Sequence, residues 1–167
     1  MKRAILAPAP LAAAALAELK DWLAITTTRD DGVLTAQLRA ALDMCEAFTG
    51  TMPLLAQCEE VLPASGDWQK MQASPVQAIT SVEGIAAQVA RFAIPAPDYA
   101  LDLAADGTAS IRLINMGAAT RVAVRFSAGL AADWFGLPES LRQGVLRLAA
   151  HQYRQRDNAD AAPVPPA

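Results

Sequence analysis

The chain contains few side chains of the types that carry out chemistry. His151 is its single histidine, and it falls on the charged side of an expected helix, far in sequence from any obvious Ser or Cys nucleophile. A catalytic triad depends on mutual geometry that nothing around His151 suggests. We therefore expect a surface or interface histidine. An enzyme whose catalytic groups converge only in three dimensions stays open as the least favoured alternative.

Metal and nucleotide chemistry also lack a suitable pattern. Cys45 and Cys58 match no zinc-ligand spacing, and we expect reduced thiols that pack as small hydrophobic groups. Asp30–Asp31 fits a helix N-terminus better than a cation site, and Glu59–Glu60 fits a solvated edge. Neither a phosphate-binding GxxxxGK[ST] loop nor a GxGxxG turn after a strand occurs. We predict no catalytic residue, no cofactor and no metal.

The composition indicates one compact domain. The 167 residues are 53% hydrophobic and 19% charged, which is enough for one core and too little for two. A net charge of −3 argues against a dedicated nucleic-acid binder, although a weakly acidic surface can line a path along which DNA slides. No apolar run is long enough to span a membrane. The first 17 residues could pass for a signal peptide, but Pro8 and Pro10 interrupt them.

Three amphipathic helices are expected, at about residues 11–24, 32–49 and 138–156. In the first, Trp22 neighbours a leucine stripe and is expected in the core. Asp30 or Asp31 is expected to cap the second helix and Gly50 to end it. The second has the clearest apolar face, which follows the i, i+4, i+7, i+11, i+14 series: Leu34, Leu38, Ala41, Cys45 and Phe48.

From about residue 54 to residue 130 the hydrophobic period changes to two, which predicts strands. Asp106-Gly107 has the signature of a tight hairpin turn. We therefore expect an α+β fold: mainly an α-helical bundle with an inserted small antiparallel β subdomain and an extended C-terminal tail. Residues 1–156 would form the single domain and residues 157–167 the tail, whose prolines favour an extended or partner-ordered strand.

The last helix carries arginines close to its apolar arc. Arg142 and Arg156 fall at the margin of the arc with Tyr153, whereas Arg154 lies opposite. Two explanations stay open for Arg142 and Arg156: they extend into water from the helix ends, or they meet a neighbouring chain.

Three bulky aromatic side chains lie in segments that resemble loops. Trp68, Trp134 and Phe135 either pack subdomains together or anchor an interface, and we expect packing.

Several segments, taken in order, resemble the head–tail connector (adaptor) proteins of long-tailed bacteriophages and gene transfer agents. LAELKDWLAI is similar to the opening helix of that family, SPVQAITSV to its P-V-x-x-I-x-S-V strand and VRFSAGLA to its V-x-Y-x-A-G strand, with Phe126 replacing tyrosine. LPESLRQGVLRLAAHQYRQR is similar to its closing helix, with Gly144 where alanine is more common. The second helix carries a further set of matching positions: Asp31, Leu34, Ala40, Ala41, Glu46, Thr49 and Gly50.

The resemblance implies a structural protein without catalytic activity. Twelve copies would self-associate into a ring beneath the portal protein, extend the channel for double-stranded DNA and meet the next ring of the neck, of stopper or tail-terminator type. Such a protein would be cytoplasmic during assembly and then reside in the neck. The expected portal-binding residues lie in the last helix and tail: Arg142, Tyr153, Arg154, Arg156, Pro163, Val164, Pro165 and Pro166.

One alternative from another class remains open. A small soluble module that binds a peptide or a ligand, in an exported form if the N-terminal segment is a signal, would share this composition. For the connector we expect a largely monomeric protein in dilute solution, because its exposed patches are modest and its last helix lacks a partner.

Overall fold

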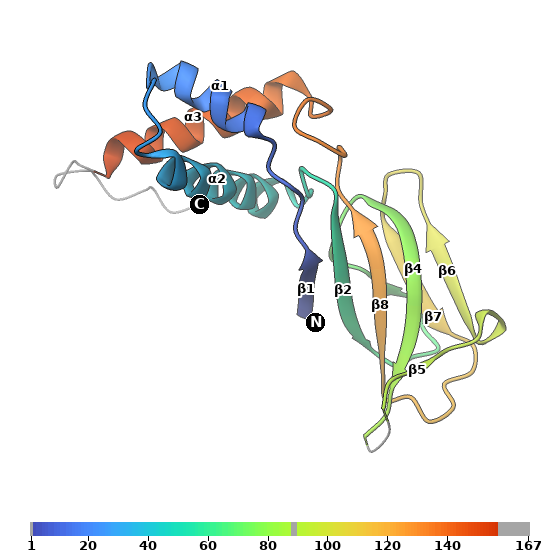
Figure 1. Ribbon diagram of the computed structural model, residues 1–167. Coiled ribbons are helices and arrows are strands. Elements are labelled where there is room, and N and C mark those ends of the chain that lie inside the picture. The colour runs from blue at the N-terminus through green and yellow to red at the C-terminus, as the bar shows by residue number, and fades with distance from the viewer. Residues whose placement is uncertain (1, 88–89, 157–167) are drawn as a thin grey trace.

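The computed structural model describes residues 2–87 and 90–156, with three helices at one end of the molecule and the strands at the other (Figure 1). The helices are α1 (Ala13–Leu23), α2 (Asp31–Thr49) and α3 (Glu139–Gln155), and a short 3-10 turn spans Ala96–Asp98. The strands are β1 (Lys2–Ala7), β2 (Ala56–Pro63), β3 (Gln69–Lys70), β4 (Val76–Ile85), β5 (Phe92–Ala93), β6 (Tyr99–Leu103), β7 (Ala109–Leu113) and β8 (Arg121–Ala128).

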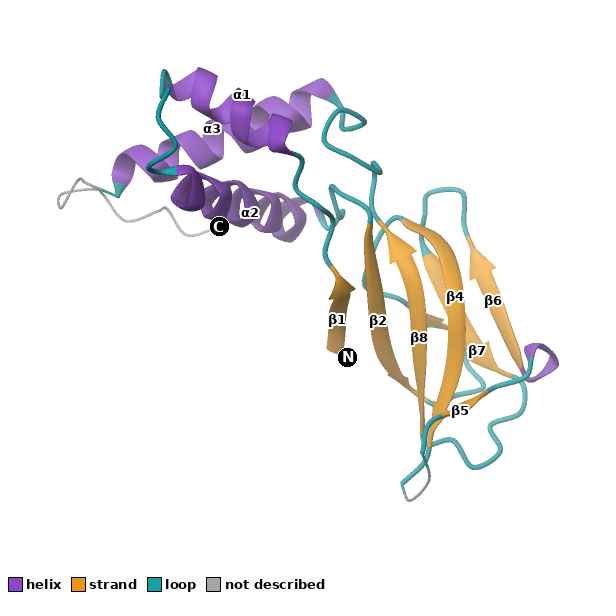
Figure 2. Ribbon diagram, viewed as in Figure 1, coloured by secondary structure: helices purple, strands orange, loops and turns teal. Residues whose placement is uncertain are grey.

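The strands form two antiparallel sheets, shown in orange in Figure 2. The larger has the order β1-β2-β8-β4-β5 and the smaller the order β3-β7-β6. Strand β8 lies at the centre and pairs with β2 along its whole length, from Ala56 opposite Ala128 to Pro63 opposite Arg121. The predicted Asp106-Gly107 turn joins β6 to β7, and Gly107 has the positive φ of 79° that such a turn requires.

The prediction of a mainly helical bundle is wrong, because the described residues contain eight strands beside three helices. The prediction that the helix at about residues 11–24 is the first ordered element is also wrong. Strand β1 precedes α1 and pairs with β2, with Ile5 opposite Cys58. The sequence KRAILA is too short and too rich in alanine to show a period of two. A strand of this kind is recognised only by the partner that its backbone pairs with.

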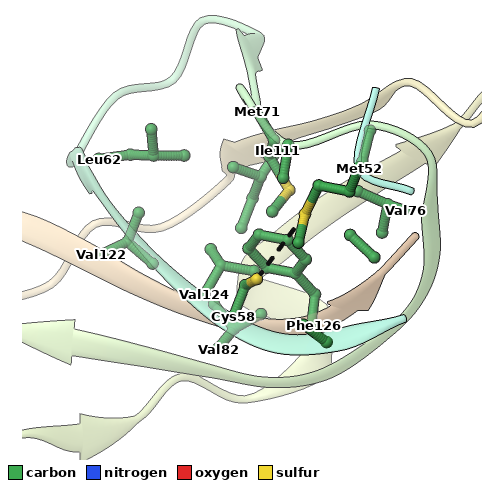
Figure 3. Packing of buried hydrophobic residues seen from close by; sticks show 14 of the residues in the cluster. Met52, Cys58, Leu62, Met71, Val76, Val82, Ile111, Val122, Val124 and Phe126 are labelled. Atoms are coloured by element: carbon green, nitrogen blue, oxygen red, sulfur yellow. Dashed lines mark hydrogen bonds between the residues drawn. The ribbon is translucent and has the colours of Figure 1, made fainter. Parts of the chain in front are cut away.

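The facing sides of the two sheets enclose one hydrophobic cluster (Figure 3). Phe126, Val124 and Ile111 are almost completely buried there. Cys58 is also buried, as predicted, with its Sγ 4.0 Å from the Met52 Sδ. Burial raises the pKa of the Cys58 thiol, so the thiol stays protonated and packs as a small apolar group.

A second hydrophobic cluster holds the helices together. Leu34, Leu38 and Ala41 are buried, as the helical spacing predicted. Of the three loop aromatics expected to pack, Trp134 does: it is 0% exposed, and its Nε1 donates a hydrogen bond to Glu18 at 3.2 Å. The same expectation is wrong for Trp68 and Phe135, which are 48% and 62% exposed.

Two aromatic residues expected in this core are exposed instead. Trp22 is 43% exposed and Phe48 is 88% exposed. Phe48 is only about 40° from Leu34 around the helix axis, at roughly 100° per residue, but it lies in the last turn of α2, beyond the buried residues Leu34, Leu38 and Ala41. The guanidinium carbon of Arg147 lies over the Trp22 ring, 6.0 Å from the centre of the ring.

Two connections run side by side between the helical end and the sheets. The Leu55 N–H donates to the Ala131 carbonyl at 2.8 Å, and the Leu130 N–H donates to the Met52 carbonyl at 2.9 Å. Gly129 has a φ of 146°, and a Cβ built on it would lie 2.5 Å from backbone atoms of Leu54 and Leu55. Only glycine lets these two connections approach each other so closely.

We expect Gly129→Ala to lower the free energy of unfolding by at least about 2 kcal/mol, because the strained φ and the backbone clash act together. Urea titration measures this loss. Gly144→Ala is the matched control, since Gly144 lies in α3 with nothing within 4 Å of an added Cβ; this change should stabilise the protein by up to about 1 kcal/mol. Equal effects of the two substitutions would contradict the role given to Gly129.

Candidate interaction surface

The first predicted interface residue of α3, Arg142, is held by its own chain. Its Nε lies 3.6 Å from Glu18 Oε2, and its Nη2 donates a hydrogen bond to Glu139. The guanidinium also lies 5.6 Å from the centre of the exposed Phe135 ring. These contacts fix the start of α3 against α1.

Tyr153 and Arg156 gather around Asp30 at the other end of α3. The Tyr153 hydroxyl donates to Asp30 Oδ2 at 2.8 Å, and this bond raises the pKa of the phenol because it stabilises the protonated form. Arg156 Nη2 lies 3.8 Å from the same oxygen, and its guanidinium is 4.0 Å from the centre of the Tyr153 ring. Asp30 is the N-cap residue of α2 but makes no side-chain capping bond, so its carboxylate ties α3 to α2 instead.

Arg154 differs from these residues. Its side chain is exposed and makes no ion pair with any residue in the described ranges. Arg147 and His151 are exposed on the same face of α3, so this face carries two arginines and a histidine. The remaining predicted residues, Pro163, Val164, Pro165 and Pro166, lie outside the described part of the chain.

The expectation that Glu59–Glu60 forms a solvated edge is wrong. Glu59 is 7% exposed and accepts hydrogen bonds from Arg91 at 2.8 and 2.9 Å and from Arg125 at 2.9 Å. Glu60 is 0% exposed and accepts the backbone N–H groups of Gln72 and Ala73 at 2.9 to 3.1 Å. These partners are distant in sequence, so only the fold reveals them.

The hydrogen bonds of Glu59 shift its titration. The bond from Arg91 is the largest cause of a pKa below the ordinary value, and the bond from Arg125 adds to it. Burial opposes both, but the two guanidinium groups dominate. Glu83 completes the cluster, with carboxylate oxygens 3.7 Å from Arg91 and 3.5 Å from Arg125.

An apolar groove lies between β1, α2 and the segment that leads into β2. Its volume is about 340 Å³, and Arg39, Asp43 and Glu46 line it beside the apolar groups. Sequence reasoning missed this groove because its lining comes from three separate segments. The apolar lining residues are Ile5, Pro8, Ala9, Leu11, Leu42, Met52, Pro53, Leu54 and Ala56.

Within residues 2–87 and 90–156, no group of three or more His, Cys, Asp or Glu side chains could hold a metal ion. No helix there has the length and apolar character to cross a membrane.

Known protein families and curated proteins give no match to this sequence. Solved structures of gene transfer agent particles do. The neck of an empty particle computed with C6 symmetry contains a chain that is 27% identical with a TM-score of 0.79, covering 99% of this chain and 90% of that one. A native neck computed with C12 symmetry gives 28% identity, a TM-score of 0.76 and coverage of 99% and 89%.

A native virion gives 29% identity and a TM-score of 0.73, with coverage of 99% of this chain and 90% of that one. All three matches extend over the helical end and the sheets together. They confirm the resemblance to neck proteins that the order of the sequence segments predicted.

We expect Glu59→Gln to destabilise the protein by about 1–3 kcal/mol at pH 7, the range for hydrogen bonds to charged groups. A folded pKa below the ordinary 4.5 means that the carboxylate stabilises the fold above pH 4.5 and loses this effect as pH falls through the folded pKa. The difference between variant and wild type should therefore shrink at pH 3, as urea titrations at both pH values would show. Glu139→Gln, at an exposed ion pair, is the control and should change stability by less than about 1 kcal/mol. A loss of stability in Glu59→Gln that is equal at both pH values would contradict the stabilising role of the ionised Glu59 carboxylate.

Proposed function

We propose that this chain is a head–tail connector of a gene transfer agent particle, a structural protein of the neck that catalyses no reaction. The likeness to neck chains over 99% of its length, at 27–29% identity, is the observation that carries this conclusion. Because the likeness includes both ends of the molecule, it concerns the whole architecture and not a shared helical motif. The same fold could host another function, but the matched chains share one location, the particle or its neck.

The connector would act as a ring of twelve copies beneath the portal. The C6 and C12 symmetries named for the similar necks support ring assembly. The ring would extend the DNA channel, and the net charge of −3 would let DNA pass without the tight phosphate contacts that a basic surface makes. Assembly would take place in the cytoplasm before the protein enters the neck.

The division into a helical end and a sheet end gives the ring two different surfaces (Figure 1). We assign the helical end, through α3 and the tail, to the portal. The sheet end would meet neighbouring copies or the next ring of the neck. Each surface is built on its own hydrophobic cluster, so both can stay rigid during docking.

The portal contact would combine a fixed helix with an extended hook. Arg142, Tyr153 and Arg156 make intramolecular contacts that set the direction of α3. Among the arginines predicted to bind the portal, Arg154 is exposed and would pair with a carboxylate of the portal protein. The tail, with Pro163, Val164, Pro165 and Pro166, would become ordered against the portal as an extended segment.

Electron microscopy of the protein mixed with isolated portal rings tests this assignment. We expect density for the connector beneath the portal at a one-to-one ratio of chains, with residues 157–167 ordered against it. A protein that remains free in the mixture would contradict the connector function.

Truncation after Asp157 should leave folding intact and abolish docking to the portal, because the sequence NADAAPVPPA offers a core no large aromatic or aliphatic side chain beyond Val164. Circular dichroism and thermal melting report folding, and co-sedimentation with portal rings reports docking. Arg154→Glu in the full chain is the companion variant and should weaken docking while preserving the tail. A truncated protein that still joins portal rings would exclude the hook.

Before it meets the portal, the protein should sediment as a monomer at micromolar concentration. The reason is that its exposed apolar patches are small compared with a stable protein interface. Analytical ultracentrifugation without portal measures this state, and a stable dodecamer under these conditions would contradict the prediction.

A further inference from the structure

Helix α2 has a second apolar face that its own chain covers only in part: Ala40 is half-buried, and Gln152 of α3 donates a hydrogen bond to the Met44 Sδ at 3.0 Å. The first face is buried against α1 and α3. The second contains no charged side chain and recurs at spacings of three and four residues, which makes one continuous stripe on a helix. We call it the α2 stripe, and it consists of Val33, Ala36, Ala40, Met44, Ala47 and Phe48.

The exposure of the α2 stripe is unusual for its composition. Phe48 is 88% exposed, the highest value among the large hydrophobic side chains of the described residues, and Met44 and Val33 are also exposed. Asp31, Arg39 and Glu46 lie on other faces of the helix, and Asp43 borders the stripe, about 20° from Ala36 at roughly 100° per residue. An exposed apolar stripe bounded by charges is characteristic of an interaction surface.

The groove between β1 and α2 lies across the helix from Phe48. Arg39, Asp43 and Glu46 mark the side of α2 that lines the groove. At about 100° per residue, Phe48 is roughly 180° from Arg39 around the helix axis. The molecule therefore presents an apolar projection on one side of α2 and an apolar groove of about 340 Å³ on the other.

We infer that the α2 stripe is the contact surface for a second copy of this chain, and that Phe48 of one copy enters the groove of the next. A closed ring needs two different patches on each subunit, because a heterologous interface joins the patch of one copy to the other patch of its neighbour. A projection and a groove on opposite sides of one helix meet this requirement. The inference rests on the ring assembly of the proposed function.

The size of the surface supports a neighbour within a ring over a free dimer. The α2 stripe spans 16 residues, from Val33 to Phe48, and is about 22 Å long at 1.5 Å per residue, which is one helix face. A stable interface buries about 800 Å² from each partner, considerably more than one helix face of this length offers. The contact would thus be weak between two free chains and would hold once the ring closes and every copy makes it twice.

Site-specific cross-linking in assembled necks tests the pairing. Phe48→Cys places a thiol on the α2 stripe, and Ala9→Cys places one in the groove. Cys45, which is half-buried, is replaced by alanine in all chains. Cys58 remains, because burial raises its pKa and makes it react slowly. A short bismaleimide is then added to necks from particles that contain the double variant.

We expect the double variant to give a ladder of covalent oligomers and each single variant to give none. In a mixture of the two single variants, cross-linked dimers should contain one chain of each kind. Self-linked Phe48→Cys chains would show a two-fold contact and overturn the inference. A neck that contains the double variant without any cross-link would overturn it too, while leaving the connector function intact.

Phe48→Asp provides a second readout. Because Phe48 is almost fully exposed, the monomer should melt within a few degrees of wild type, and incorporation into necks should fall at least about tenfold. A folded Phe48→Asp chain that enters necks at the wild-type ratio would overturn the inference. A wild-type chain that is absent from necks would overturn the proposed function and this inference with it.

Discussion

The close approach of two connections at Gly129 is the constraint on which the architecture depends. Each hydrophobic cluster, one between the sheets and one among the helices, is complete without the other. Their relative placement follows from the backbone hydrogen bonds that join Met52 to Leu130 and Leu55 to Ala131. These bonds require contact between two main chains, and a side chain at Gly129 would prevent it. Backbone packing at this glycine, together with the ion pair between Arg3 of β1 and Glu46 of α2, thus determines how the molecule presents its two ends.

Two buried glutamates on β2, Glu59 and Glu60, then hold the strands and loops around β2 in place. Glu60 is enclosed and accepts two backbone N–H groups, and Glu59 binds two arginines from other parts of the chain. A buried carboxylate without such partners would be strongly destabilising. Adjacent glutamates on β2 are therefore compatible with the fold only if Arg91, Arg125 and the segment at Gln72 reach their places. This requirement favours a unique arrangement of strands around β2.

The sequence predicts those features that depend on local spacing. Leu34, Leu38 and Ala41 are buried at helical intervals, and Asp106-Gly107 makes its turn, because neighbouring residues decide both. The prediction of a mainly helical fold is wrong in part because β1 is recognised only through its pairing with β2. For the same reason the groove and the partners of Glu59 were not foreseen. Along α3, the spacing placed Arg142 and Arg156 at the margin of the arc, but it could not show that Glu18 and Asp30 hold them.

For Phe48, the hydrophobic periodicity of the sequence and the exposure in the structure lead to different conclusions. Its spacing from Leu34 suits a core position, and the apolar pattern of α2 is genuine, yet the pattern contains two faces with different partners. Hydrophobic periodicity reports that a face is removed from water; it does not report whether the covering surface belongs to the same chain. In a protein that works as one member of a ring, an apolar residue assigned to the core and then found exposed is informative. It marks the surface at which the isolated chain is incomplete.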